Sequence, residues 1–238
     1  MSQKQDIFTL MGGRVAFRRG NYNPTSDAVW LAAFAAGLRI NGGDVLDAGV
    51  GTGAAALCLL AHCPDMKVAG IDNSEEMLAE CAENARLNNR RIELIQADIL
   101  KWKTSRAFDL VMTNPPYFKG TSARHGAHHN ADLPGWTRKC AGRLRPGGFF
   151  CAILDTAAVA DVISALNPTC GDIAVFPLFG SKNSAERVII GARKGSKGPA
   201  VIFKGLSMND ESILRGGLTI GAGWAKLCQR NNAVLINV

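Results

Sequence analysis

The chain has 238 residues, of which 47% are hydrophobic and 20% charged, and its formal net charge is +7. This length and composition predict one globular domain with a hydrophobic core, with or without a small appendage, and the 26 unperiodic glycines exclude a collagen-like fibre. No apolar run reaches the ~18 residues of a membrane span and the first residues are polar, so we expect a cytoplasmic protein that does not bind a membrane.

Residues 1–40 predict a short N-terminal extension that packs on the main domain. A hairpin that turns at Gly12-Gly13 comes first, because two adjacent glycines favour a tight turn. An alanine-rich helix is expected to run from residue 28 to about residue 38, with Ser26 or Asp27 as its N-cap.

Residues 41–194 alternate between strand and helix patterns. The expected strands cover residues 44–48, 67–71, 92–96, 108–113, 149–154, 173–177 and 187–192. The expected helices cover residues 54–62, 74–88, 133–144 and 157–166. This alternation predicts an α/β fold in which helices cover both faces of a parallel sheet.

The tail, residues 195–238, has a weaker pattern. Short strands are expected at residues 201–203 and 233–238. We expect the tail to belong to the same domain as the core.

Positive charge gathers in two segments. The first, between residues 119 and 145, holds one acid, three of the four histidines and these six cations: Lys119, Arg124, Arg138, Lys139, Arg143 and Arg145. The second holds Arg14, Arg18 and Arg19. Both favour an anionic partner such as nucleic acid, with a solvated surface as the plain alternative.

The cysteines and histidines predict no metal site. The seven cysteines are irregularly spaced without a Cys-x-x-Cys pair, so they read as buried apolar residues rather than as disulfides. His125, His128 and His129 have no nearby Cys or carboxylate cluster that would complete a site, which favours a polar loop or a nucleic-acid contact.

A glycine turn follows the first core strand, in the sequence Asp47-Ala-Gly-Val-Gly-Thr-Gly53. Glycines let the backbone turn sharply between a strand and a helix and let a ligand approach it closely. The pattern Gly49-x-Gly51-x-x-Ala54 also satisfies the dinucleotide fingerprint, so the turn alone leaves the cofactor open.

Two acids end the next two strands, where such sheets bind their ligands. Asp72 is placed to accept hydrogen bonds from the hydroxyls of a ribose, and capping of the helix that follows is a plain alternative compatible with that role. Asp98 is placed to accept from an adenine amine while Ile99 packs on the ring, with a plain turn residue as the alternative.

The most specific motif is Asn114-Pro115-Pro116-Tyr117-Phe118, directly after the fourth strand. The prolines stiffen the loop, which lets the Asn114 side-chain oxygen and the Pro115 carbonyl act as a rigid pair of acceptors. Such a pair polarises an amino group whose lone pair is delocalised into a ring, and Tyr117 offers a flat face on which that ring stacks. A rigid turn packed with aromatic residues is the plain alternative.

These motifs together resemble the class I S-adenosylmethionine-dependent methyltransferases of the Asn-Pro-Pro-Tyr type, and most closely the bacterial tRNA1(Val) adenine N6-methyltransferases. The resemblance runs from about Arg14 to Lys194 and includes Pro24-Thr-Ser-Asp-Ala-Val-Trp-Leu31, Arg145-Pro-Gly-Gly148 and Arg187-Val-Ile-Ile-Gly-Ala-Arg193. It implies a Rossmann-like fold whose seven-stranded, mostly parallel sheet has an antiparallel last strand, with S-adenosylmethionine as cofactor.

The resemblance also implies roles for individual residues. Those expected to bind the cofactor are Asp27, Asp47, Gly49, Gly51, Asp72, Asn73, Asp98, Ile99 and Asn114. Those expected to hold the target amine are Asn114, Pro115 and Tyr117, and those expected to contact the rest of the substrate are Pro116, Phe118, Lys119 and Arg124. The implied reaction is N6-methylation of the adenine 3′ to the anticodon of a tRNA.

Other substrates stay open, because the same motif serves rRNA adenine, DNA adenine and protein glutamine methyltransferases. Basic residues after the motif favour RNA, since cations there can bind phosphates beside a base that has left its stack. A non-catalytic RNA-binding protein and an NAD-dependent oxidoreductase are further alternatives. The sequence does not decide between a monomer and a homodimer.

Overall fold

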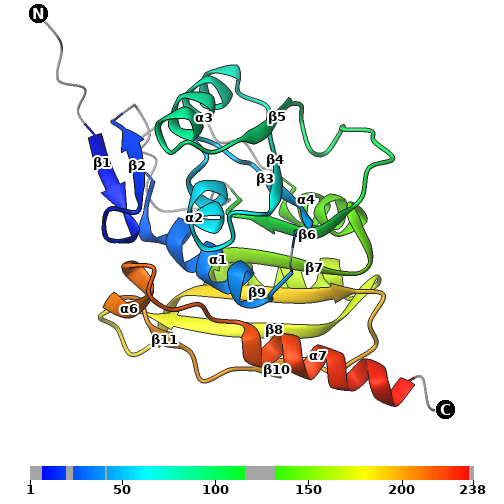
Figure 1. Ribbon diagram of the computed structural model, residues 1–238. Coiled ribbons are helices and arrows are strands. Elements are labelled where there is room, and N and C mark those ends of the chain that lie inside the picture. The colour runs from blue at the N-terminus through cyan, green and yellow to red at the C-terminus, as the bar shows by residue number, and fades with distance from the viewer. Residues whose placement is uncertain (1–6, 20–23, 41, 116–131, 236–238) are drawn as a thin grey trace, which may run out of the picture.

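The computed structural model describes residues 7–19, 24–40, 42–115 and 132–235, with side chains as far as residue 229 (Figure 1). Its centre is one large sheet with the strand order β10-β8-β9-β7-β6-β3-β4-β5, and β11 pairs with β8 beside β10. The strands are β3 (Asp44–Ala48), β4 (Lys67–Asp72), β5 (Ile92–Gln96), β6 (Phe108–Thr113), β7 (Leu144–Asp155), β8 (Cys170–Phe179), β9 (Ala185–Lys194), β10 (Val201–Ile202) and β11 (Leu206–Ser207). Only β9 runs antiparallel to its neighbours among these strands.

The predicted seven strands are all present, and their parallel arrangement is confirmed, with the seventh, β9, antiparallel as expected. The count of seven is too low, because the two-residue strands β10 and β11 extend the sheet beyond β8. Strand β7 also begins five residues earlier than expected. Leu144 already pairs with Phe108, and an irregular register keeps the Pro-Gly-Gly segment within the strand.

Helices cover both faces of the sheet because alternate residues of each buried strand point to opposite sides. Val45 and Leu110 join the cluster that contains α1 (Ser26–Gly37), α2 (Ala54–His62), α3 (Glu75–Leu87) and α7 (Ala222–Leu235). Leu46 and Val111 join the cluster that contains α4 (Leu133–Gly142) and α5 (Val159–Leu166). The short helices are η1 (Met11–Gly13), η2 (Thr156–Ala158) and α6 (Glu211–Leu214).

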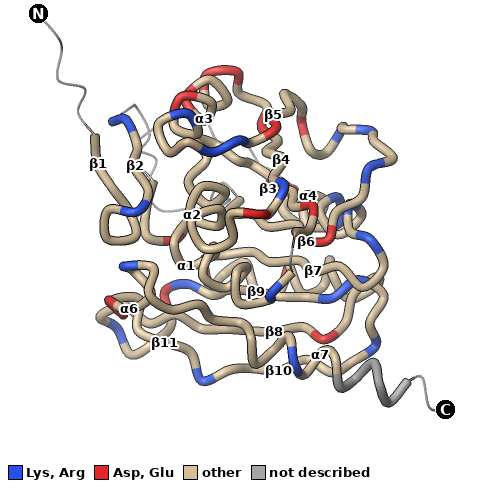
Figure 2. Tube along the Cα trace, in the orientation of Figure 1, with Lys and Arg blue, Asp and Glu red and all other residues tan. Residues whose placement is uncertain are grey.

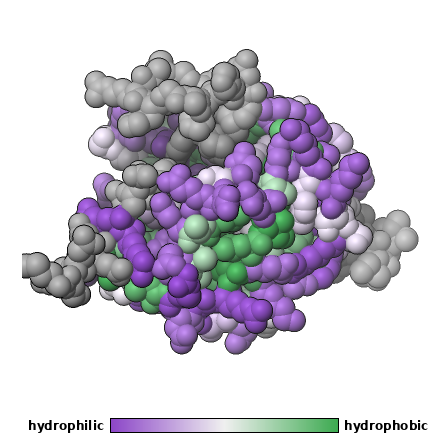
Figure 3. Space-filling model, turned by 90° about the horizontal axis from the view of Figure 1, so that it is seen from above, coloured by the Kyte–Doolittle hydropathy of each residue, from purple (hydrophilic) through white to green (hydrophobic). Residues whose placement is uncertain are grey.

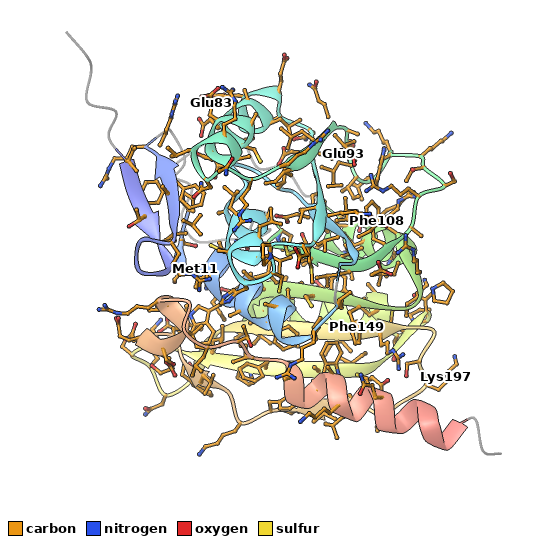
Figure 4. The ribbon with its side chains drawn as sticks, in the orientation of Figure 1. Met11, Glu83, Glu93, Phe108, Phe149 and Lys197 are labelled. Carbon is orange, nitrogen blue, oxygen red and sulfur yellow. The ribbon has the colours of Figure 1, made fainter. Side chains whose placement is uncertain are left out.

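The N-terminal segment forms the expected hairpin, β1 (Ile7–Leu10) and β2 (Val15–Arg18), joined through η1. Met11 of η1 is buried, and η1 contacts α6 (Figure 4 labels Met11). The prediction that Ser26 or Asp27 caps α1 is wrong. The N-cap position is Thr25, which makes no side-chain capping bond, and Asp27 lies in the first turn with its side chain buried.

The predicted strand at 233–238 is also wrong, since α7 continues to Leu235 and the last three residues lie outside the described part. The tail is helical because Trp224 and Cys228, four residues apart, face the core together. The Trp224 ring stacks with Phe34 and meets Phe149 edge-on (Figure 4 labels Phe149).

Some of the basic residues that were expected to bind an anionic partner form contacts within the fold. Arg14 donates to the carbonyls of Gly216 and Ala61, and Arg18 pairs with Glu83. Figure 2 shows Lys and Arg scattered over the trace, with acidic positions gathered on α3. None of the described helices is long and apolar enough to cross a membrane.

Candidate active site

The glycine turn between β3 and α2 has the left-handed backbone that its sequence predicts. Gly49, Gly51 and Gly53 have φ angles of +75°, +51° and +87°. A Cβ atom on Gly49 would lie 3.2 Å from the Trp136 ring, and one on Gly53 would lie 2.7 Å from the Cys81 sulfur. A Cβ atom on Gly51 would meet nothing within 4 Å, so Gly51 is where the turn leaves room for a ligand.

Asp47 is the last residue but one of β3, just before this turn. Its side chain is 2% exposed, and its Oδ2 atom has no hydrogen-bond partner among the described residues. Burial raises the pKa of Asp47 to about 7, against a backbone hydrogen bond from Ala56 and with a further increase from Asp72. A buried carboxylate oxygen without a partner, beside an open glycine, fits a cofactor that carries positive charge.

Asp72, at the end of β4, is held by two backbone donors. The Gly51 amide donates to its Oδ2 atom at 3.0 Å, and the Ser74 amide donates to its Oδ1 atom at 3.0 Å. Asp72 does not cap α3, because Ser74 occupies the N-cap and accepts from Met77. Asp72 is therefore oriented by the turn beside it, and the neighbouring Asn73 is exposed.

Asp98 and Ile99 follow β5. The Leu100 amide donates to Asp98 Oδ1 at 2.9 Å, which is the contact expected of a turn residue. The Lys101 ammonium lies 3.6 Å from Asp98 Oδ2. The Asp98 side chain keeps 36% exposure. Ile99 is 2% exposed and belongs to the core cluster on the α4 side.

The Asn-Pro-Pro-Tyr motif begins where β6 ends. Thr113 pairs with Ala48 in the parallel register, so Asn114 and Pro115 emerge beside the glycine turn. Pro115 is buried and Asn114 is half-buried. The remaining predicted substrate and target residues lie outside the described residues: Pro116, Tyr117, Phe118, Lys119 and Arg124.

Trp136, on the first turn of α4, is a site residue that the sequence analysis missed. Its indole N–H donates to the Thr113 hydroxyl at 3.2 Å, and that hydroxyl donates to the Ala48 carbonyl at 2.7 Å. The ring also packs on Gly49. Trp136 therefore contacts both the turn after β3 and the last residue of β6, a link that only the fold brings about.

Asp27 belongs to an ion cluster at the end of β7. The Arg187 Nε atom lies 3.1 Å from Asp27, and Arg187 also lies 3.6 Å from Asp155. The described contacts therefore join Asp27 of α1 to β9, which gives it a structural partner as well as its predicted cofactor role.

Two of the basic residues that follow the motif in the sequence form contacts within the fold. Arg145 bridges Asp44 and Asp109 at 2.7 and 2.6 Å, at the opposite ends of the strands from Asn114. Arg143 donates to the carbonyls of Thr104 and Trp102. Arg138 and Lys139 remain exposed on α4.

Figure 3 shows one face of the molecule, on which hydrophilic residues surround an apolar area.

The sequence from residue 45 to residue 148 matches the profile of a methyltransferase domain family. The structure superposes on the crystal structure of a predicted O-methyltransferase from Agrobacterium tumefaciens with a TM-score of 0.69 at 21% identity, covering 82% of this chain and 98% of that one. Residues 45–148 therefore match a methyltransferase domain, and the fold is that of the class I, S-adenosylmethionine-dependent methyltransferases. The predicted fold and cofactor are thereby confirmed.

The curated relatives that match the chain include enzymes of two kinds. The chain is 34% identical over 161 residues to a tRNA1(Val) (adenine(37)-N6)-methyltransferase of Klebsiella pneumoniae (strain 342), covering 62% of this chain and 64% of the relative. It is 41% identical over 73 residues to a release factor glutamine methyltransferase of Lactococcus lactis subsp. lactis (strain IL1403), covering 31% and 27%. The chain thus spans less than two thirds of the length of these relatives.

Proposed function

We propose that this protein transfers a methyl group from S-adenosylmethionine to N6 of an adenine in RNA, with the adenine 3′ to a tRNA anticodon as the favoured target. The observation that carries the proposal is the position of Asn114 and Pro115. They leave β6 next to the glycine turn, because Thr113 and Ala48 are paired in the sheet. A base amine held there lies beside the cofactor.

The residues around the turn suit the cofactor. S-adenosylmethionine supplies an activated methyl group on a positively charged sulfur. Asp47 offers an unpartnered buried oxygen, and Gly51 leaves space at the backbone. Asp72 is oriented for the ribose hydroxyls and Asp98 for the adenine amine. Asp27, Gly49, Asn73 and Ile99 complete the proposed cofactor contacts.

Asn114 and Pro115 act on the substrate. Their two carbonyl oxygens accept both N–H groups of the target amine, which draws the nitrogen lone pair out of the ring and towards the methyl group. Asn114 is neutral, so it polarises the amine without a full charge beside the sulfonium. Tyr117 stacks on the base, Pro116 and Phe118 contact the substrate, and Lys119 and Arg124 bind its phosphates. No strong base is required, because the excess proton can leave to water.

RNA is favoured over a protein side chain by the longer match to the tRNA enzymes and by the basic residues after the motif. Glutamine N5-methylation is the second candidate, because a glutamine amide presents the same N–H pair and the release factor enzymes match a shorter segment at higher identity. The two candidates differ in what the cations after the motif contribute to binding of the substrate. Neutralising Lys119 and Arg124 should raise KM for RNA more than it lowers kcat.

The experiment is nucleoside mass spectrometry of tRNA and rRNA from cells with and without this protein, followed by methylation of the identified RNA by the purified enzyme. We expect N6-methyladenosine to be lost from tRNA in the deletion strain. Asn114→Ala should abolish transfer and keep cofactor affinity within several fold, while Asn167→Ala, at the exposed end of α5, should leave both unchanged. An unmodified nucleoside profile together with loss of release factor methylation would establish the second candidate instead.

A further inference from the structure

We propose that Trp136 is a positioning residue of the methyl transfer: its indole holds Thr113, and through Thr113 the Asn114-Pro115 acceptors, in place against the cofactor turn. This inference rests on the proposed role of Asn114 and adds a residue that the motif does not contain.

The contacts of Trp136 form a short chain across the site. The indole N–H donates to Thr113 Oγ1 at 3.2 Å, and Thr113 Oγ1 donates to the Ala48 carbonyl at 2.7 Å. Thr113 is 1% exposed and directly precedes Asn114. A hydroxyl that both accepts and donates has its rotamer set by two partners, so the chain orients the end of β6 relative to the end of β3.

The same ring also sets the position of the glycine turn. A Cβ atom on Gly49 would lie 3.2 and 3.4 Å from two carbon atoms of the indole, so the ring packs directly on the backbone there. One side chain thus touches the turn that faces the cofactor and the strand end that presents the acceptors. Methyl transfer needs these two parts aligned, and a misplacement of ~1 Å can cost about a hundredfold in rate.

Trp136 is itself rigidly mounted. Asp132 caps α4: its carboxylate accepts from the Gly135 amide at 2.7 Å and its carbonyl accepts from the Trp136 amide at 2.7 Å. The next turns of α4 are anchored by buried Thr137 and Cys140. The indole therefore acts from a fixed helix, as a residue that aligns a site needs to do.

The test separates the N–H group from the ring. Trp136→Phe keeps an aromatic ring against Gly49 and removes the donor, and Thr113→Val removes the hydroxyl. Each should lower kcat about tenfold while KM and Kd for S-adenosylmethionine stay within about twofold. Because both changes break one chain, the double variant should lose no more than the worse single variant.

Trp224→Phe is the matched control. It also removes a buried indole donor, which bonds to the Asp172 carbonyl at 2.7 Å under α7. This variant should lower the urea midpoint and leave kcat unchanged. An unchanged kcat in Trp136→Phe, or losses that multiply in the double variant, would overturn the proposal.

A second readout does not depend on the substrate. The indole N–H resonance that disappears in Trp136→Phe should shift in Thr113→Val, and a resonance that stays in place would also overturn the proposal. If the wild type methylates a glutamine peptide and not RNA, the proposed function fails. The kcat comparison is then made on the peptide and still tests Trp136.

Discussion

The buried Asp47 carboxyl makes stability fall as pH rises. Its pKa in the folded protein is about 7, against an ordinary value of 3.8, because burial disfavours the charged form. Folding therefore favours the protonated acid. The raised pKa lowers the free energy of unfolding by nothing below pH 3.8 and by a growing amount between pH 3.8 and 7. Above pH 7 the loss is constant at about 4 kcal/mol.

Asp47→Asn replaces the acid by a neutral group of the same shape. The free energy of unfolding of the variant minus that of the wild type should rise by about 2–3 kcal/mol from pH 5 to pH 8. Only the wild type has an acid at position 47 that ionises in the folded protein over that range. Urea unfolding of both proteins at four pH values measures this difference, in which the other titrating groups cancel. Asn167→Ala, at the exposed end of α5, is the control: it removes no titrating group and should give a difference that does not change with pH.

The same group couples to the cofactor. A positively charged ligand favours the ionised form of Asp47, so S-adenosylmethionine binding at pH 7 should release about half a proton. Calorimetry in two buffers of different ionisation enthalpy measures that release. A stability difference between Asp47→Asn and wild type that is flat with pH would refute the reasoning, since Asp47 would then be ionised throughout.

Three further predictions concern the turn and the opposite end of the sheet. Gly51→Ala should lower the free energy of unfolding by about 1–2 kcal/mol, because the backbone there is left-handed, and should weaken cofactor binding. Gly53→Ala should lower it further, because the new methyl group meets the Cys81 sulfur. Urea unfolding measures the stability of both variants and calorimetry measures their cofactor affinity. Asp72→Ala should weaken S-adenosylmethionine binding by about tenfold or more, and unaltered affinity would exclude its ribose role. Arg145→Met should lower the thermal midpoint with kcat unchanged, since its two carboxylate partners lie away from the site; a fall in kcat would place it in the reaction.

The parts of the fold that were predictable are those whose signals are local. The strands at 44–48, 92–96 and 108–113 have the predicted bounds, because each is a short segment rich in apolar residues between polar or glycine-rich segments. The helix α7 was missed because glycines at 221 and 223 suggest a loop, although the spacing of Trp224 and Cys228 was a usable helical signal.

The parts that were not predictable depend on contacts between distant residues. Nothing near Trp136 in the sequence shows that its ring meets Gly49, since sheet formation brings α4 beside the turn. The same holds for Arg145, which looked like part of a basic surface and proves to be paired with acids at the starts of β3 and β6. The glycine turn and the Asn114 motif were visible because a short segment carries each one.

Helix α1 has consequences for how the chain is made. From Asp27 to Gly37 every residue is buried, and the surface that covers it includes the late segments α6 and α7. The Trp30 indole, for example, bonds to the Met208 carbonyl, 178 positions further on. At a translation rate of ~5–20 residues per second, ribosomes need about 10–35 s to supply that partner. During synthesis the apolar part of α1 that α6 and α7 cover stays exposed to solvent, so we expect ribosome-associated chaperones to bind the nascent chain there.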